Sequence, residues 1–471
     1  MKNDMDHRLA LAPLFEAQRS GFAQDPYPNW PARAARLRAL DALLLANRSA
    51  IAEAISADFG HRAAGDTDLA DILGSHLAIK HALKHGRRWM RPERRSAGML
   101  LRPARASVLA QPAGVVGIIV PWNYPLFLAI GPLTGALAAG NRAMIKLSEL
   151  TPRFAELFAK LIAATFTPDE VTVINGDAGV ARAFAAQPFD RLLFTGSTRV
   201  GREVMLAAAA NLTPVVLELG GKSPALIGPD ARFDDAVEAI VSGKLFNAGQ
   251  TCVAPDYVLL PRGRSAAFLE RARQVTARLY PGLAGNADYS SIISAQHVAR
   301  LDQLIAEVSS RGAMVHTLSE GGGDASARRY APLLVTGAPD DTGLMQEELF
   351  GPVLPLVEYD RFEDAVAYIS ARARPLAMYL FETRQARIDW VLRHSHAGGV
   401  TVNDTLLHVA CDDLPFGGVG ASGIGSYHGI EGFRAFSHTK AVLAQSRLNL
   451  RGLVRPPYGK ALATLMRFFL R

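Results

Sequence analysis

One of the two cysteines in the chain, Cys252, lies in the stretch FNAGQTCVAP. Most free cysteines act as small buried hydrophobic residues, and that interpretation stands beside a second one. A cysteine thiolate is also a strong nucleophile, so Cys252 could form a covalent bond with a substrate. The second interpretation requires a base, hydrogen-bond donors for an oxyanion and an electron acceptor elsewhere in the sequence.

Two other polar residues stand in positions that suit this chemistry. Glu218 lies in the apolar run VVLELGGKSP, where it either points to solvent at a strand end or acts as a general base. Burial would raise the pKa of such a carboxyl and fit it to activate water near neutral pH. Asn123 lies between two prolines in PWNYP, where its amide could donate to an oxyanion or simply form part of a turn.

A nucleotide site is suggested by two strand ends. In DRLLFTGSTRVG a strand enters a turn with Gly196, Ser197 and Gly201 and opens a helix, an arrangement that suits a pyrophosphate. The pattern is not G-x-G-x-x-G, and similar turns without a ligand are common. In AMIKLSEL, Lys146 and Glu149 could hold ribose hydroxyls or form a surface pair.

The elements that would position these residues follow from apolar periodicity. Residues 29–58 and a second pattern ending near Trp89 predict helices, and residues 106–125 predict strand, turn, strand and loop. The run TPRFAELFAKLIAATF predicts a helix capped by Thr151 with Pro152 in its first turn.

Short apolar strands then alternate with helices of about ten to fifteen residues, which predicts parallel βαβ units covered on both faces. A second alternating region runs from SPALIG to about residue 404. The glycine-rich residues 414–429 contain apolar and aromatic side chains, and we expect an ordered loop there.

Composition narrows the function classes. The 471 residues are 49% hydrophobic and 20% charged, which is typical of a globular protein of two or three domains. The net charge of +7 raises the possibility of nucleic-acid binding, but the basic run at residues 84–95 has no nucleic-acid-binding signature around it, so we expect a solvated surface helix. Two cysteines make no disulfide framework, and no spacing resembles a zinc site. Without a spanning run or a basic leader, we expect a cytoplasmic protein.

FTGSTRVG, LELGGKSP, FNAGQTC, EELFGP and PWNYP resemble the motifs of the NAD(P)-dependent aldehyde dehydrogenase superfamily. The resemblance extends from the N-terminal helices to about residue 445. The short N-terminus and LPFGGVGASGIGSYHG look like the class 3 branch, whose members are typically dimers, and NDTLLHVACDDLPFGG is most similar to coniferyl aldehyde dehydrogenases.

The resemblance implies roles for the residues above. Cys252 would attack the aldehyde, the Asn123 amide and the Cys252 backbone N–H would hold the oxyanion, and Glu218 would activate the hydrolytic water. Lys146 and Glu149 would hold the adenosine ribose of the cofactor. Gly196 and Ser197 would lie under its pyrophosphate, and Glu348 and Phe350 would hold its nicotinamide end. The acid at Glu149 favours NAD, and NADP remains open.

The implied architecture is an α/β aldehyde dehydrogenase-like fold with a Rossmann-like cofactor domain, an α/β catalytic domain and a small β oligomerisation element. We expect the cofactor domain at residues 1–99 and 113–218 and the catalytic domain at residues 219–405. The oligomerisation element would comprise residues 100–112 and 430–446, and residues 447–471 would form a tail. The resemblance also implies a homodimer. The tail is basic and too short to span a bilayer, so surface association is the minor alternative there.

The substrate implied is an aromatic, coniferyl-type aldehyde, with medium or long-chain aliphatic aldehydes as the alternative. Trp122, Tyr124 and Phe416 could line the pocket, although aromatic walls also accept alkyl chains. A coenzyme A-dependent acylating enzyme would lack the base at Glu218, and a scaffold or nucleic-acid-binding protein would not need the whole set. We expect Cys411 to be passive, and His428 and His438 to be hydrogen-bonded residues that lock a loop.

Overall fold

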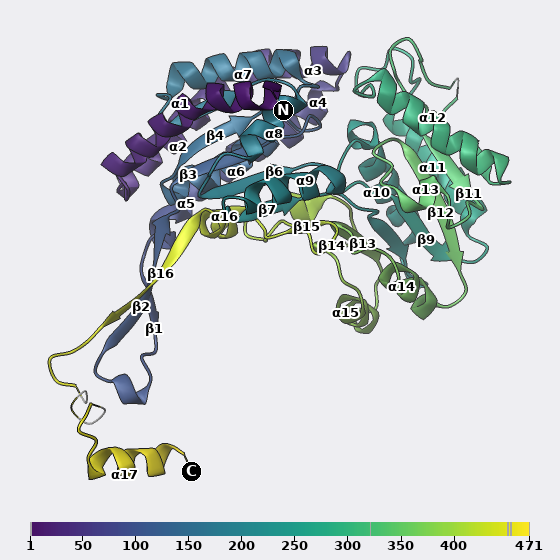
Figure 1. The fold of residues 1–471 in the computed structure, drawn as a ribbon. Helices are drawn as coiled ribbons and strands as arrows, with labels where there is room; N and C mark the ends of the chain where they lie inside the picture. The colour runs from purple at the N-terminus through teal and green to yellow at the C-terminus, as the bar shows by residue number, and fades with distance from the viewer. Residues whose placement is uncertain (1, 321, 450–451, 453–454, 471) are drawn as a thin grey trace.

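The computed structural model describes residues 2–320, 322–449, 452 and 455–470, and it shows two α/β bodies with a β arm projecting from the first (Figure 1). The first body is built on a six-stranded sheet of order β15-β7-β6-β3-β4-β5, parallel except for β15. Its strands are β3 (Val115–Ile119), β4 (Arg142–Lys146), β5 (Val171–Ile174), β6 (Arg191–Thr195), β7 (Val215–Glu218) and β15 (Gly423–Ile424).

Helices cover both faces of this sheet because its strands are apolar on both sides. Val115 and Ile119 of β3 pack with one set of helices, and Val116 and Ile118 pack with the other, as the alternation of a strand requires. On the first face lie α1 (Lys2–Gln24), α8 (Ala178–Ala185) and α9 (Thr198–Ala209). On the second lie α2 (Trp30–Ala46), α3 (Arg48–Phe59), α5 (Gly74–Trp89), α6 (Phe127–Ala139), α7 (Pro152–Thr165) and α16 (Gly429–Ala435).

The second body contains a seven-stranded sheet of order β10-β11-β12-β9-β8-β13-β14, parallel except for the β10–β11 pair. Its strands are β8 (Pro224–Ile227), β9 (Tyr257–Pro261), β10 (Met314–Thr317), β11 (Leu333–Thr336), β12 (Val353–Tyr359), β13 (Ala377–Phe381) and β14 (Gly399–Val402). Its helices are α10 (Phe233–Leu245), α11 (Ser265–Leu279), α12 (Ala295–Ser310), α13 (Gly343–Gln346), α14 (Phe362–Ser370) and α15 (Gln385–His394). Apolar side chains of α10 and α11 pack on one face, and those of α14 and α15 pack on the other.

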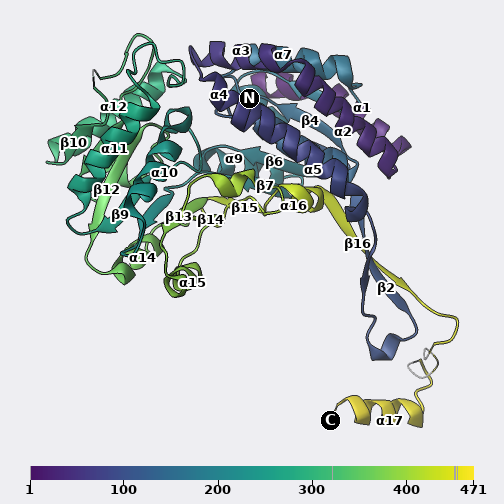
Figure 2. The same ribbon diagram turned by 180° about the vertical axis from the view of Figure 1, so that it is seen from behind.

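The arm is an antiparallel sheet of order β1-β2-β16, and it stands away from both bodies in the reverse view as well (Figure 2). Its strands are β1 (Glu93–Arg95), β2 (Arg105–Pro112) and β16 (Ser437–Ala444), with the short helix η2 (Met99–Leu101) between the first two. Beyond the arm, α17 (Lys460–Phe469) exposes Met466 and Phe468. No helix in the described part of the chain is both long and apolar enough to cross a bilayer.

The structure changes two of the expected boundaries. Residues 93–95 form β1 of the arm, although we expected them in the cofactor domain. Residues 430–435, which we expected in the oligomerisation element, lie in α16, which packs on α6 in the first body. The arm therefore begins earlier in the chain and receives less of its C-terminal segment than the sequence suggested.

The helix over residues 152–165 is confirmed, but its expected cap is wrong. Pro152 opens α7 and Thr151 occupies the cap position, yet the Thr151 side chain makes no cap hydrogen bond. The carboxylate of Asp58, at the end of α3, accepts from the N–H groups of Arg153 at 3.0 Å and Phe154 at 2.9 Å. A residue distant in the sequence therefore satisfies the free N–H groups of the first turn.

Candidate active site

The cysteine loop begins with an unusual backbone. After α10, the short helix η3 (Phe246–Gly249) contains Asn247, Ala248 and Gly249 in the left-handed region, with φ of 50°, 51° and 75°. A side chain at Gly249 is excluded, because a Cβ there would lie 2.3 Å from the carbonyl oxygen of Gly351. Such strain persists only where the surroundings enforce it, and it is common at functional sites.

Buried side chains enforce this shape. The Gln250 amide donates to the carbonyl oxygens of Asn247 and Ser291, both at 3.0 Å, and its oxygen accepts from the N–H of Ile293 at 2.9 Å. Asp66 accepts the N–H of Asn247 at 3.0 Å. The loop that carries Cys252 is therefore fixed by hydrogen bonds on both sides of the turn.

Asn123 lies against the same loop. Its side-chain nitrogen donates to the carbonyl oxygen of Gln250 at 3.2 Å, and its own carbonyl oxygen accepts from the side chains of Arg62 at 2.8 Å and Asn247 at 3.2 Å. The amide carries two N–H groups, so one remains available to a bound ligand. The structure thus brings the PWNYP loop and the cysteine loop together, although they lie far apart in the sequence.

Glu218 ends β7 with its side chain buried, which excludes the interpretation that it points to solvent. Neither carboxylate oxygen has a hydrogen-bond partner among the described residues. Burial, and secondarily the charge of Glu348, raises the pKa of Glu218 to about 8. An unpartnered buried carboxyl is costly to keep, and this one can take a proton near neutral pH.

The Cys252 thiol lies in the same electrostatic environment. Burial raises the pKa of Cys252 well above its ordinary value, and the charges of Glu218 and Glu348 raise it further. The backbone N–H groups of Cys252 and Val253 act in the opposite direction. The resting side chain is therefore a neutral thiol, which must lose its proton before it can attack.

A cleft of about 1030 Å³ opens between the ends of β3, β4 and β6 and the N-terminus of α9. Its walls include Lys146, Glu149, Gly196 and Ser197. Burial lowers the pKa of Lys146, whose amine lies 3.8 Å from the Glu149 carboxylate. Gly201 does not line this cleft, because it lies inside α9. A Cβ there would lie 2.6 Å from the Leu219 side chain, so the glycine allows α9 to pack closely on Leu219.

The family model described as the aldehyde dehydrogenase family matches residues 15–442. The chain belongs to this family. It is 49% identical to a protein of Pseudomonas aeruginosa named "Probable coniferyl aldehyde dehydrogenase", across 97% of this chain and 95% of that protein. It is 47% identical to the "Coniferyl aldehyde dehydrogenase" of a Pseudomonas species, across 93% and 92% of the two chains.

Among solved structures, the substrate-bound state of Staphylococcus aureus AldH superimposes with a TM-score of 0.92 at 35% identity. That match covers 98% of this chain and 99% of the other. The expected α/β aldehyde dehydrogenase fold is confirmed, and the protein is an NAD(P)-dependent oxidoreductase.

The cleft of this aldehyde dehydrogenase fits a dinucleotide. The N-terminus of the 12-residue helix α9 opens into it behind Gly196, and the hydroxyl of Thr195 is buried there without a partner among the described residues. Helix N-termini suit phosphate groups. Ser197 caps α9 by accepting the N–H of Val200 at 3.4 Å, so its hydroxyl already serves the turn.

Glu348 and Phe350 do not line the cleft: Glu348 lies near Glu218, and Phe350 lies against Trp122, which does line it. A Cβ on Gly220 would lie 1.9 Å from a carboxylate oxygen of Glu348, so only glycine allows this approach. Phe350 has a φ of 50° and packs edge-on against Trp122 at 5.4 Å. The Trp122 ring also contacts His297, and both line the cofactor cleft, which places Trp122 on the cofactor side of the site.

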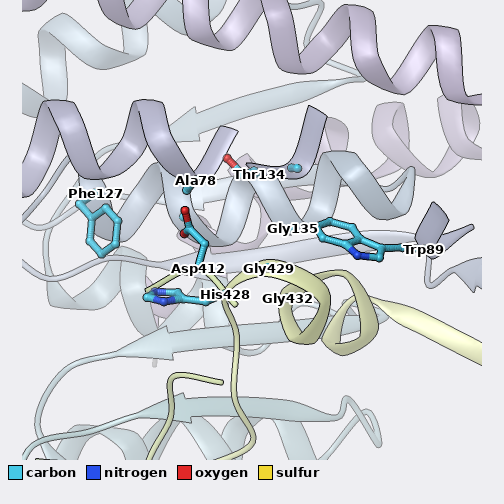
Figure 3. Close-up of a pocket in the computed structure, with 11 residues that line it drawn as sticks. Ala78, Trp89, Phe127, Thr134, Gly135, Asp412, His428, Gly429 and Gly432 are labelled. Carbon is cyan, nitrogen blue, oxygen red and sulfur yellow. The ribbon is translucent and has the colours of Figure 1, made fainter. Parts of the chain in front are cut away.

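A second, much smaller pocket lies between α5, α6 and the C-terminal segment (Figure 3). Phe127 and Asp412 line it, together with His428, whose two ring nitrogens have no partner among the described residues. The expectation of a hydrogen-bonded His428 is therefore wrong. Burial lowers the pKa of His428 to about 3, so the ring is neutral. His438 and Cys411 are exposed.

Tyr427 was not among the residues predicted from the sequence, and its buried hydroxyl also lacks a partner among the described residues. Burial, and secondarily the charges of Glu218 and Cys252, raises the pKa of Tyr427, so its hydroxyl lies near these two side chains. Its ring contacts Phe416 edge-on at 5.9 Å. The sequence signal that could have indicated Tyr427 is its place, with Phe416, in the glycine-rich residues 414–429. Tyr124, in contrast, is buried behind the site with its hydroxyl 2.5 Å from that of Thr251.

Proposed function

We propose that the protein oxidises aromatic aldehydes of the coniferyl type to carboxylic acids. The convergence of Cys252, Asn123 and the unpartnered carboxylate of Glu218 in one buried site carries the proposal for the reaction. The names of the two Pseudomonas relatives support the substrate class. The buried ring of Tyr427 lies near Glu218 and Cys252 and packs against Phe416, so the surroundings of the site are aromatic.

In the first half of the reaction, Cys252 loses its proton to solvent and its sulfur forms a bond to the aldehyde carbon. The carbonyl electron pair moves to oxygen, where the Asn123 amide and the Cys252 backbone N–H donate to it. When bound, the cofactor supplies the acceptor for the hydride that leaves the same carbon. Lys146, Glu149, Gly196 and Glu348 would hold it. The product on the protein is a thioester at Cys252.

In the second half, Glu218 takes a proton from water as the water oxygen adds to the thioester carbon. The carbon–sulfur bond breaks, the acid leaves, and the Cys252 thiolate takes the proton from Glu218, which restores the thiol and the carboxylate. A carboxyl with a pKa of about 8 can accept and return protons within the physiological pH range. Enzymes that pass the acyl group to coenzyme A have no need of this base, so Glu218 argues against an acylating reaction and against a non-catalytic scaffold.

The test of the reaction is formation of reduced cofactor from coniferaldehyde and NAD. The Cys252→Ala and Cys252→Ser variants should lose it, and retention at a comparable rate would overturn the mechanism. The test of the substrate is kcat/KM for coniferaldehyde and for decanal at saturating NAD. A preference of more than about tenfold for decanal would reassign the substrate to aliphatic aldehydes.

We also propose that the protein is a homodimer in which the arm pairs with the catalytic sheet of a second copy. Within the described residues β16 pairs only with β2, and Val442 and Leu443 on it are 38% and 52% exposed. Such an unpaired apolar strand edge favours association. The strands β10 and β14 are the edges of the catalytic sheet and could accept it. Light scattering at micromolar concentration should report a dimer, and a monomer would contradict the proposal.

A further inference from the structure

A buried ion pair lies behind the catalytic residues. The guanidinium of Arg62 and the carboxylate of Asp71 approach to 2.9 Å, and neither side chain has any exposed surface. Arg62 follows α3, and Asp71 lies in the π-helix η1 (Thr67–Leu73). Neither residue belongs to the motifs that indicated the reaction, and neither touches the cysteine sulfur.

This ion pair is hydrogen-bonded to the backbone of the Asn123 loop at two points. Arg62 donates to the carbonyl oxygen of Asn123 at 2.8 Å. Asp71 accepts the N–H groups of Leu126 at 3.1 Å and Phe127 at 3.0 Å, where α6 begins. The backbone between Asn123 and Phe127 is therefore held at one end by the cation and at the other by the anion.

The same segment also reaches the cysteine loop. The Arg62 guanidinium lies 4.8 Å from the centre of the Tyr124 ring, and the Tyr124 hydroxyl is hydrogen-bonded to Thr251, next to Cys252. Asp66, in the short helix α4 (Ala64–Asp66), accepts both the N–H of Asn247 and the hydroxyl of Ser290. One stretch of chain thus contacts both loops that must meet around a substrate carbonyl.

Stability alone is a weak reason for such a pair. Removing two charges from water is costly, and well-packed apolar residues of similar volume often stabilise a protein as well or better. The ion pair forms directed hydrogen bonds to one backbone carbonyl and two backbone N–H groups, which apolar residues could not form. These backbone groups belong to the segment Asn123–Phe127, so holding them fixes the position of the Asn123 backbone and of the side chain attached to it.

We propose that Arg62 and Asp71 are positioning residues that set the distance between the Asn123 amide and the Cys252 sulfur, and thereby form the oxyanion site. The inference rests on the proposed function. Displacing a catalytic group by about 1 Å can slow a reaction by about 100-fold, so small errors in this placement matter. Neither side chain has exposed surface with which to touch a substrate.

A double-mutant cycle between Arg62→Lys and Asn123→Ala tests this. The measured quantity is the single-turnover rate constant for hydride transfer from coniferaldehyde to NAD. Each single variant should lose about 100-fold, and the double variant should be little slower than Asn123→Ala alone, because Arg62 acts through Asn123. Additive losses would overturn the proposal. If the wild-type protein forms no reduced cofactor, the proposed function itself fails.

The control is Arg33→Lys. Arg33 is another fully buried arginine, whose guanidinium donates to the carbonyl oxygens of Pro28 and Ala138 in the first body, away from the cysteine loop. This variant should lower the melting temperature but leave hydride transfer unchanged and additive with Asn123→Ala. A loss of hydride transfer equal to that of Arg62→Lys would show a general effect of buried arginine and contradict the proposal.

A second readout separates positioning from damage to the nucleophile. Alkylation of Cys252 by iodoacetamide, followed by peptide mass spectrometry, needs the sulfur but no oxyanion. Arg62→Lys should leave this rate within about twofold of wild type while hydride transfer falls. A parallel fall in both would overturn the proposal. If Arg62→Lys does not fold, the apolar pair Arg62→Met with Asp71→Leu replaces it, with the same expectation.

Discussion

The carboxylates of Glu218 and Glu348 share one buried site, and the charge of Glu348 raises the pKa of Glu218. Burial is the larger cause for both, and the pKa of each is about 8. Glu218 comes from the end of β7 and Glu348 from the chain that follows α13, so each body contributes one acid. The protonation of the proposed base thus depends on a residue of the other body.

Replacing Glu218 should separate the two halves of the reaction. In Glu218→Gln the thioester should still form, with an initial burst of reduced cofactor, because the thiol proton leaves to solvent and not to Glu218. Hydrolysis of the thioester should fall by about 100-fold or more, because general-base catalysis contributes about 10²–10⁴-fold. Stopped-flow measurement of the burst and the steady state distinguishes these steps. A full steady-state rate would remove Glu218 from the mechanism.

The pH dependence of hydrolysis should report the coupling between the two acids. Only the carboxylate form of Glu218 is a base, so the hydrolytic rate of the wild type should rise with pH around a midpoint near 8. Glu348→Gln removes a negative charge that disfavours this carboxylate, so the midpoint should move to lower pH. It should stay above 4.5, because burial, the larger cause, remains.

The neighbouring Glu347 offers the matched control, since its side chain is 58% exposed and pairs with Arg300. Glu347→Gln should leave the midpoint unchanged. The profile is measured on the hydrolytic step, with the acyl-protein already formed, so that weaker cofactor binding in Glu348→Gln does not enter the comparison. An unshifted midpoint in Glu348→Gln would mean that its charge does not reach the base.

Gly249→Ala should damage the cysteine loop. The position has a φ of 75°, which costs an alanine about 1–2 kcal/mol, and the new Cβ would also collide with the Gly351 carbonyl. We expect a lower melting temperature and loss of hydride transfer. Gly312→Ala is the control, because Gly312 has a φ of 87° but no neighbour within 4 Å of its Cβ. It should show the backbone cost alone and keep full activity.

The cap of α7 gives a prediction about stability. Asp58→Ala should lower the free energy of unfolding by about 1–2 kcal/mol, because two N–H groups of the first turn lose their acceptor. Thr151→Val should cost little, since the buried Thr151 hydroxyl has no partner in the described part of the chain. Thermal unfolding of the two variants compares them. A larger loss in Thr151→Val would restore the local cap that the sequence suggested.

The contrast between Thr151 and Asp58 shows what could be predicted from the sequence. Local apolar patterns predicted β2, β3, β4 and α7, because each pattern depends on residues a few positions apart. The acceptor for the α7 N-terminus could not be found in this way, because Asp58 reaches it only once α3 and α7 pack together. The same reason explains β1, whose place in the arm depends on pairing with β2.

The candidate site divides in the same manner. Cys252, Glu218 and Asn123 were indicated by polar residues in apolar or rigid surroundings, and the structure gathers them. Arg62 and Asp71 gave no such signal, because an arginine and an aspartate in an N-terminal helical region are ordinary surface residues in a sequence. Their complete burial becomes visible only in the folded structure.

The short strand β15 constrains when this protein can become active during synthesis. Gly423 pairs with Glu218, and the N–H of Leu219 donates to the carbonyl oxygen of Ser422, so the C-terminal chain completes the strand that ends in the base. A nascent chain that contains Cys252 but not yet Gly423 therefore holds the proposed nucleophile, while the strand of the proposed base still lacks its neighbour. The appearance of Gly423, and not that of Cys252, therefore sets the earliest moment at which both of these proposed catalytic residues stand in a completed fold.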